Sequence, residues 1–523
     1  MRRHLLLLNL SLSLLLPSTP LFAANSSFEY IGYGGNRVVS GSMHLLKIDG
    51  EAIMFDAGAF YDDANTNAIA AIPSSLVTSL KAIVISHAHS DHIGRLTTIL
   101  NLGYTNAIYC TEPTRAFLPV MTDMSARLSD HGIENFYYSK RNVGQKRLVV
   151  VHSHTDCPGG SKISPANRQD ITARRTELAD KGYRLCNFCV ELDIEHIMDK
   201  VKTIPLYTPV NITPNITIEF FNTPHLPGSV MIKATSGKSG KSLLFTGDYG
   251  SALSPFLPEQ DFVKEANYAI IEGTYGTDLY PITPSSRREF RQYIGDQIKK
   301  NQRVFIPAFV LDRTQQILWE ISQGMKEGTI PPDTPVKIYG NSVFQINNIY
   351  LKEFRHEKYH PFFASRYFSE PPFDNIFTRG TTISKAVPGE ISIASSGLVD
   401  HANTPTQIRN WLTDPQTTFI FVSYHSPDST SGKLIRLGRK KTIQINNDTI
   451  PIKATVKKFD CFSGHSNYKQ ITTMLRQVSG LEKVLLVHLD NDRVDELLKH
   501  YQQEFPALQF IAPIVTQPII LSK

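Results

Sequence analysis

The chain has 523 residues, of which 41% are hydrophobic and 20% are charged, with a formal net charge of +6. This length allows two or three domains with sizeable cores, and the composition is that of an ordinary soluble globular protein, which excludes a low-complexity chain. The weak positive charge is compatible with an anionic substrate but does not require one.

The first residues, MRRHLLLLNLSLSLLLPSTPLFAANSS, have the pattern of a secretory signal peptide. Two arginines precede an apolar stretch that is too short to span a bilayer, and two alanines at 23 and 24 offer a cleavage site. We favour this interpretation over a short membrane anchor. We therefore expect a signal peptide at residues 1–23 and an exported mature protein, periplasmic or secreted, without a membrane partner.

Strand-like runs dominate the next part of the chain. Short runs alternate with glycines between residues 28 and 60, and the fully apolar run LKAIVIS predicts a buried strand at 80–86. The stretch GRLTTILNLG, residues 94–103, predicts a helix. Further strands are expected at 105–110, 215–224, 229–235 and 241–248. This part therefore predicts a β-rich α/β layer system.

A different region starts near residue 277. Residues 283–302 predict a helix with Ser285 or Ser286 as its N-cap, followed by a strand, a second helix and another strand. This alternation indicates a parallel sheet flanked by helices. From residue 462 the earlier character returns. We expect a domain at 277–461 inserted into a first domain whose two parts span 26–276 and 462–523.

The stretch IVISHAHSDHIG, residues 83–94, places a cluster of polar side chains after the buried strand. Alternate residues of an extended chain share one side, so His87, His89 and Asp91 are expected to face one way and His92 another. One loop can thus serve two neighbouring metal sites. Imidazole and carboxylate are the ligands of catalytic zinc, so we favour a metal centre over a polar loop that is rich in histidine by chance.

The stretch SHAHSDH resembles the HxHxDH signature of the metallo-β-lactamase fold. The resemblance implies further site residues, each of which ends an apolar run in this sequence. Asp56 in IMFDAG is expected to orient the ligand loop through hydrogen bonds rather than to touch metal. His225 in FFNTPHLPGS is expected to bind a metal, and Asp248 in LLFTGD is expected to bridge two metals.

Within that fold, the chain resembles the β-CASP nucleases, in particular the cleavage-and-polyadenylation nuclease subunit and bacterial ribonucleases. The markers are Glu272 in IEGTYG, His465 in DCFSGHSNY and His488 in VLLVHLD. Histidine at the third marker accompanies RNA substrates in this family, so His488 favours RNA over DNA. The implied fold class is α/β: a metallo-β-lactamase αββα sandwich with an inserted β-CASP α/β domain.

The chain departs from the family pattern at several positions. Leu489 and Asp490 replace Gly-Glu after the third marker, Gly273 replaces a serine, and Asp312 stands where a glycine is usual. The departures leave every expected metal ligand in place. They leave substrate shape and sequence preference open.

The resemblance implies a metal-dependent hydrolase, a nuclease with two zinc ions about 4 Å apart that activate the attacking hydroxide. One zinc would bind His87, His89 and His225, and the other Asp91, His92 and His488, with Asp248 as the bridge. His465 would act as general acid, and Glu272 would orient it. The expected substrate is single-stranded RNA, with DNA as the alternative, and a homodimer is a further expected partner.

A cysteine-containing stretch at 135–205 lies outside the family resemblance. Cys186 and Cys189 in CNFC, with Cys157 and either His152 or His154, could form a third, structural zinc site. An oxidising compartment would favour a disulfide within the same set, and unrelated surface cysteines are the remaining alternative. Cys110 and Cys461 are expected to be small buried residues.

Three other functions compete with an exported ribonuclease. A different hydrolase on the same fold, such as a lactamase or small phosphodiesterase, would leave the second domain and the three markers without a role. A non-enzymatic RNA-binding protein would leave costly buried ligands without metal. A DNA nuclease differs only in substrate, and an assay on both nucleic acids separates it.

Overall fold

The computed structural model describes most of the chain, and the predicted signal peptide and the cysteines of the 135–205 stretch lie outside the described residues. No described helix is both long and apolar enough to cross a membrane. The described residues are 27–59, 72–128, 139–141, 148–150, 194–250, 254–279, 283–369, 373, 376–380, 383–395, 399, 404–422, 425, 429–439, 441–445 and 448–522.

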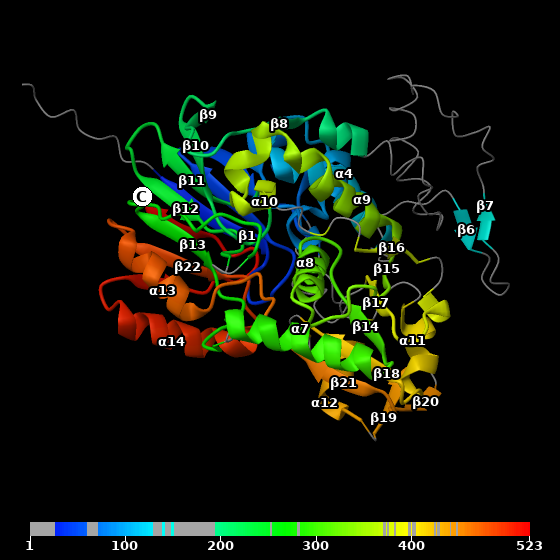
Figure 1. Cartoon of the computed structure of the whole chain (residues 1–523). Coiled ribbons are helices and arrows are strands. Elements are labelled where there is room, and N and C mark those ends of the chain that lie inside the picture. Colours follow the sequence, from blue (N-terminus) through cyan, green and yellow to red (C-terminus); the bar gives the residue numbers. More distant parts are fainter. Residues whose placement is uncertain are drawn as a thin grey trace, which may run out of the picture.

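Two seven-stranded sheets form the first layer system (Figure 1). The first sheet has the order β24 (Ile519–Ser522), β1 (Phe28–Gly34), β2 (Met43–Ile48), β3 (Glu51–Phe55), β4 (Ala82–Val84), β5 (Ile108–Cys110), β8 (Val201–Thr203). The second has the order β23 (Gln509–Ile511), β22 (Lys483–Val487), β13 (Tyr268–Glu272), β12 (Ser242–Phe245), β11 (Val230–Ser236), β10 (Ile216–Asn222), β9 (Val210–Thr213). The last strands of the chain therefore join both sheets, since β24 pairs with β1 in the first and β22 pairs with β13 in the second.

The two sheets pack face to face through aromatic side chains. Phe55 stacks on Phe245 with 5.1 Å between ring centroids, and Phe28 lies 5.3 Å from Tyr268. Helices α13 (Tyr468–Gln477) and α14 (Val494–Glu504) cover the outer face of the second sheet (Figure 1). Helices α1 (Ser74–Ser79), α3 (Leu96–Asn101) and α4 (Glu112–Leu128) pack with the first. This is the predicted αββα sandwich.

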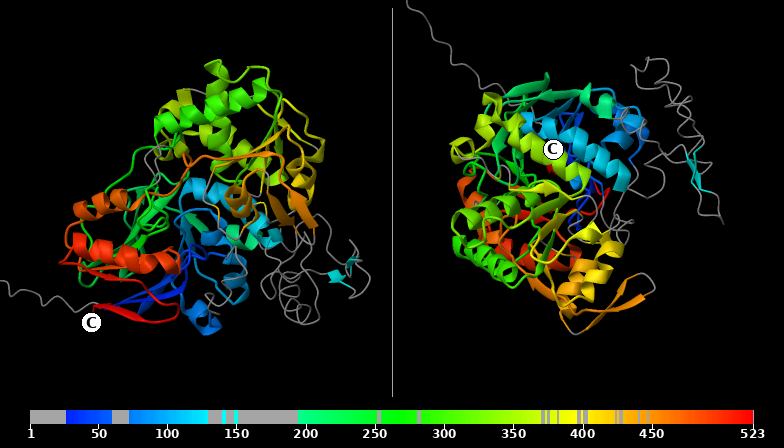
Figure 2. Two further views of the ribbon diagram at one scale, coloured as in Figure 1. Left: turned by 90° about the horizontal axis from the view of Figure 1, so that it is seen from below. Right: turned by 45° about the vertical axis from the view of Figure 1, so that its right-hand side comes forward.

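A third sheet lies beside the sandwich (Figure 2), and its strands come between β13 and β22 in the sequence. All its strands are parallel. Their order is β16 (Thr378–Arg379), β15 (Val336–Tyr339), β17 (Ile391–Ala394), β14 (Arg303–Pro307), β18 (Thr417–Phe421), β21 (Thr455–Lys458). The predicted fold class is thereby confirmed, whereas the boundaries at residues 277 and 461 stay predictions.

Helices cover both faces of the third sheet. The side chains of β14 alternate between the two faces and so pack in two different cores. Val304 and Ile306 pack in the core that holds α7 (Pro284–Lys299), α8 (Arg313–Lys326) and α9 (Asn341–Leu351). Phe305 packs in a separate core with α11 (Thr404–Leu412) and α12 (Thr430–Leu437). Shorter elements among the described residues include α2 (Ser90–Ile93), α10 (Arg366–Ser369), β6 (Ser139–Arg141), β7 (Leu148–Val150), β19 (Thr442–Ile445), β20 (Asp448–Pro451) and the 3₁₀ turns η3 (Glu353–Arg355), η4 (Glu357–Phe362), η5 (Ile383–Lys385) and η6 (Asn491–Arg493).

The expected N-cap of α7 is wrong. Thr283 caps the helix: its side chain accepts a hydrogen bond from the backbone N–H of Ser286, whose side chain accepts one from the backbone N–H of Thr283. Pro284 occupies the first helical position, where a missing N–H costs nothing. A proline directly after a threonine was the stronger cap signal in this stretch.

The aspartate that replaces a family glycine stands in a backbone conformation that favours glycine. Asp312 has φ 68°, just before α8. Its carboxylate is buried and accepts hydrogen bonds from Gln316 at 2.5 Å and from the Tyr350 hydroxyl at 3.4 Å. These contacts stabilise a residue that would otherwise be strained there.

Candidate metal centre and proton-donor site

The HxHxDH stretch changes conformation in its middle. It is extended up to His89 (φ −67°, ψ 151°), which occupies the N-cap position of the short helix α2 without a capping hydrogen bond from its side chain. Asp91 lies inside that helix and not in an extended chain. The expectation that Asp91 shares a side with His87 and His89 is therefore wrong, because the helical turn starts at Ser90. The turn instead groups Asp91 with His92.

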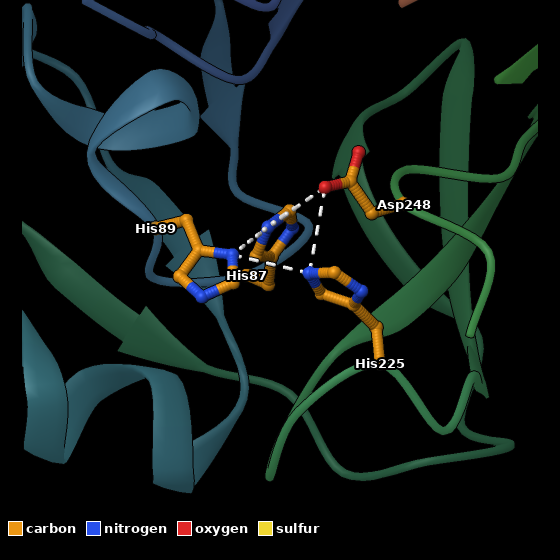
Figure 3. Close-up of side chains that lie close together, drawn as sticks. All are labelled: His87, His89, His225 and Asp248. Atoms are coloured by element: carbon orange, nitrogen blue, oxygen red, sulfur yellow. Dashed lines mark hydrogen bonds and ion pairs between the residues drawn. The ribbon is translucent and has the colours of Figure 1, made fainter. Parts of the chain in front are cut away.

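Four side chains from three separate loops converge on one point (Figure 3). His87 and His89 come from the loop after β4, and His225 and Asp248 from loops after β10 and β12. The Asp248 Oδ2 atom lies 3.4 Å from Nε2 of both His87 and His225. The His89 Nδ1 atom lies 3.2 Å from the His87 Nε2 and 3.1 Å from the His225 Nε2. These four residues form the first ligand group.

A second ligand group lies on the other side of Asp248. It consists of Asp91, His92 and His488. The His488 Nε2 atom lies 3.4 Å from Asp91 Oδ2. The other Asp248 oxygen, Oδ1, lies 3.2 Å from His92 Nε2 and 3.7 Å from His488 Nε2. One carboxylate thus presents one oxygen to each group, which is the geometry of a bridging ligand.

The donor set fits two metal cations. His92 Nε2 and Asp248 Oδ1 are buried and have no hydrogen-bond partner, although they lie 3.2 Å apart. Buried polar atoms without partners are costly, and a cation between the ligand atoms would satisfy them. Imidazole nitrogen and carboxylate oxygen are the ligands that zinc prefers in catalytic sites. The arrangement therefore suits zinc.

The histidines of the first ligand group have the protonation state that metal binding needs. Burial lowers the pKa of His87 and His225 well below the usual range and that of His89 to about 4, more than nearby carboxylates raise it. These imidazoles are neutral at pH 7, and only neutral imidazole binds metal.

Asp56 lies behind the ligands rather than among them. Its Oδ1 accepts a hydrogen bond from the Ser86 backbone N–H at 2.7 Å, and its Oδ2 from the Ser86 hydroxyl at 2.9 Å. Its Oδ2 also lies 2.7 Å from His92 Nδ1, which leaves the His92 Nε2 for metal. This is the orienting position that the sequence predicted for it.

Glu272 and His465 form a pair beside the metal ligands. The His465 Nδ1 atom lies 3.1 Å and 3.0 Å from the two Glu272 oxygens, and 3.9 Å from Asp248 Oδ2. The backbone N–H of Tyr249 donates a hydrogen bond to the Glu272 Oε1 atom at 2.6 Å. Burial lowers the pKa of His465, but the Glu272 and Asp248 carboxylates outweigh burial and raise this pKa to about 9. His465 can therefore carry a proton at neutral pH.

The second sheet brings these distant residues together. Strands β13 and β22 are parallel neighbours, and Glu272 pairs in register with Val487. His488 follows immediately with φ 51°, and its backbone N–H donates to the Gly35 carbonyl at 2.6 Å. Asp56 also has a positive φ, 58°. Strained backbone at two site residues is typical of functional sites, where the surrounding fold holds it.

Several residues that support the site were missed by the sequence analysis. Ser86 holds Asp56, and the Gly464 carbonyl accepts from His225 Nδ1 at 2.8 Å. The hydroxyl of Thr274 contacts Glu272, His465 and His488. A hydroxyl two residues after Glu272 was the one signal in the sequence, whereas a backbone carbonyl leaves none.

Two of the departures from the family pattern are packing partners. A Cβ at Gly273 would lie 3.3 Å from the Leu489 Cδ2 and 2.9 Å from a methyl of Leu497. Leu489 is buried. The small residue after Glu272 therefore makes room for the large residue after His488.

We expect Gly273→Ser to lower the free energy of unfolding by about 1–3 kcal/mol, because it overpacks this contact. Leu489→Ala should recover part of that loss when both changes are combined, with an interaction energy of about 0.5–3 kcal/mol. Denaturant unfolding of the two single variants and the double variant, at a fixed zinc concentration, measures this interaction energy. Strict additivity would contradict the packing argument.

The predicted cysteine site, Cys157, Cys186, Cys189 and His152 or His154, lies outside the described residues. Cys110 and Cys461 are buried and free, as expected.

Comparison with known families agrees with this geometry. Residues 36–168 match the metallo-beta-lactamase superfamily. Residues 449–509 match the Zn-dependent metallo-hydrolase RNA specificity domain. The first match contains the HxHxDH stretch, and the second contains His465 and His488.

Three similar proteins cover most of the chain. Transcription termination factor FttA of Methanothermobacter thermautotrophicus is 24% identical over 89% of this chain and 67% of its own length. Ribonuclease TTHA0252 of Thermus thermophilus is 22% identical over 89% of this chain and 94% of its own. The RNase J-like protein of Methanocaldococcus jannaschii is 24% identical over 87% of this chain and 91% of its own.

Proposed function

We propose that this chain, which belongs to the β-CASP nuclease family of the metallo-β-lactamase superfamily, hydrolyses phosphodiester bonds of RNA in a zinc-dependent reaction. Membership in the family supports the reaction class, which is metal-dependent hydrolysis. The substrate, the number of zinc ions and the place of action are the parts that we propose.

One observation supports this function more than any other. The two oxygens of Asp248 face two separate ligand groups. The His465 ring, which Glu272 holds, lies 3.9 Å from the same Asp248 carboxylate. A simple hydrolase that attacks a carbonyl needs the metals but not a histidine that a carboxylate holds beside them. A phosphodiester has a poor leaving group, the sugar oxygen, which needs a proton.

We propose two zinc ions, one in each ligand group, with Asp248 between them. When bound, they would supply charge neutralisation at the phosphate and activation of the attacking water. The chain's own part is to hold the ligands rigid. Asp56 orients His92, and the Gly464 carbonyl orients His225.

His465 is the proposed general acid. Glu272 occupies the Nδ1 side of its ring, so Nε2 is the nitrogen that can donate to the departing sugar oxygen. The negative charge of Glu272 keeps the ring protonated until the transfer. The products would carry a 5′-phosphate and a 3′-hydroxyl. The ring also lies within metal-ligand distance of Asp248 and His488, so its role needs a test that reads zinc as well as rate.

A comparison of RNA and DNA tests the substrate. The mature protein is incubated with end-labelled single-stranded RNA and DNA of one sequence, with and without chelator, and the product ends are typed by phosphatase treatment. We expect cleavage of RNA that chelator abolishes. Equal or faster cleavage of DNA would contradict RNA as the preferred substrate. Cleavage of neither nucleic acid would contradict the proposed nuclease activity.

RNA as substrate is supported by the match of residues 449–509 and by relatives named as ribonucleases. His488 is the residue of this chain that favours it. A homodimer stays a prediction.

We also propose that the protein is exported, on the evidence of the basic and apolar sequence at residues 1–23. Cell fractionation and N-terminal sequencing of the mature chain test this. Recovery from the periplasm or medium with a new N-terminus near residue 24 is expected. A chain that keeps its first residues inside the cell would contradict export and leave the nuclease proposal intact.

A further inference from the structure

Thr274 stands between the metal side and the proton-donor side of the site. It follows β13, two residues after Glu272, and its side chain is buried. Its hydroxyl oxygen contacts the Glu272 Oε2 atom, lies 2.9 Å from His488 Nδ1 and 3.3 Å from His465 Nδ1. One hydroxyl therefore touches the acidic marker and both histidine markers.

Counting protons fixes the direction of these hydrogen bonds. A hydroxyl donates one proton and accepts at its lone pairs, whereas a carboxylate only accepts. The Thr274 proton therefore goes to Glu272, which is nearer than the other acceptor within reach, the His488 carbonyl oxygen at 3.4 Å. The Thr274 oxygen must then accept from His488 Nδ1, so this nitrogen carries the hydrogen. In the neutral ring, which is the form that binds metal, the His488 Nε2 is then left with a lone pair.

That Nε2 is the nitrogen on the metal side. It lies 3.4 Å from Asp91 Oδ2 and 3.7 Å from Asp248 Oδ1. The backbone of His488 is in the left-handed region, outside the regular geometry of β22, so the strand alone does not aim the ring. A side-chain contact on Nδ1 can do so, and Thr274 supplies it.

We propose that Thr274 is a positioning residue that holds His488 in its Nδ1–H form and thereby makes the Asp91–His92–His488 group competent to bind zinc. Through Glu272, the same hydroxyl links this group to His465. The inference rests on the proposed function only for the identity of the metal, since the hydrogen-bond geometry stands without any assumption about RNA.

Zinc affinity is the readout that separates this role from mere packing. In Thr274→Val the methyl groups keep the volume and the hydroxyl is lost, and in Thr274→Ser the hydroxyl is kept. Thr418→Val is the matched control, because Thr418 is also fully buried and its hydroxyl bonds Gln297, far from the site in the third sheet. Each protein is titrated with zinc in competition with a chromophoric chelator.

We expect Thr274→Val to weaken one of the two zinc sites by about 10–100-fold, as removal of an outer partner of a metal ligand does. Thr274→Ser should restore the affinity, and Thr418→Val should leave it unchanged. Thr274→Ala serves if the valine variant does not fold, with the same expected loss. Wild-type affinity in the valine or alanine variant, or failure of serine to restore it, would overturn the proposal.

The RNA proposal can fail separately. If zinc affinity depends on Thr274 but the wild-type protein cleaves no RNA, the positioning role stands and the proposed function falls. If the wild-type protein cleaves RNA and Thr274→Val binds zinc normally, the reverse holds.

Discussion

Replacement of His465 by alanine is expected to lower the rate of RNA cleavage by about 10²–10⁴-fold, which is the usual contribution of general acid catalysis. The zinc content should not change. His465 binds Glu272 through Nδ1 and lies 3.9 Å from the bridging carboxylate of Asp248, so its loss removes a proton donor and no proposed ligand. Single-turnover cleavage of end-labelled RNA and elemental analysis of the same sample measure both quantities.

His500→Ala is the matched control, because His500 lies on α14, where its ring packs against Tyr468 and Tyr501, neither of which is a proposed site residue. It should keep the wild-type rate. Unchanged cleavage by His465→Ala would remove the general-acid role. A loss of zinc together with rate would show instead that His465 is a metal ligand with Asp248 and His488, the alternative that the geometry leaves open.

Replacement of Asp248 by alanine is expected to have the largest effect on metal binding. Its two oxygens face His87 and His225 on one side and His92 on the other. Without the carboxylate, histidine nitrogens that lie close together lose the negative charge between them. We expect the zinc affinity of both ligand groups to fall by more than the about 10–100-fold that follows loss of an outer partner. Cleavage should disappear together with the zinc.

Asp261→Asn tests whether loss of another carboxylate, one that is half-buried in the segment between β12 and β13, would act in the same way. Asp261 accepts a hydrogen bond from the Asn222 backbone N–H at 2.6 Å and lies outside both ligand groups. We expect it to keep zinc and activity. Full zinc occupancy in Asp248→Ala would contradict the bridging assignment.

Much of the fold followed from patterns within short stretches. The apolar run at 80–86 predicted a buried strand, and the alternation of strands and helices after residue 283 predicted the parallel third sheet. These features depend on neighbouring residues only. The N-cap of α7 was wrong for a local reason as well, since the Thr-Pro pair at 283 and 284 outweighed the two serines that follow.

The candidate site depends on contacts that no local pattern contains. Glu272 and His488 meet because β13 and β22 are parallel neighbours in the second sheet, although all strands of the third sheet lie between them in the sequence. The resemblance of short motifs to a family named these residues, but their distances and hydrogen-bond partners came from the fold. The positive φ of Asp56 and His488 and the turn that starts at Ser90 have no signal in residue type. Backbone geometry at such positions is imposed by the surrounding structure.

Removal and return of zinc is the most direct test of the central claim, that this chain cleaves RNA with metals held by Asp248 and its two ligand groups. Zinc is stripped with chelator, its absence is verified by elemental analysis, and cleavage of single-stranded RNA is followed as zinc is added back. We predict no cleavage by the zinc-free protein and recovery that reaches its plateau at about two zinc ions per chain. Full cleavage by the verified zinc-free protein would contradict the account.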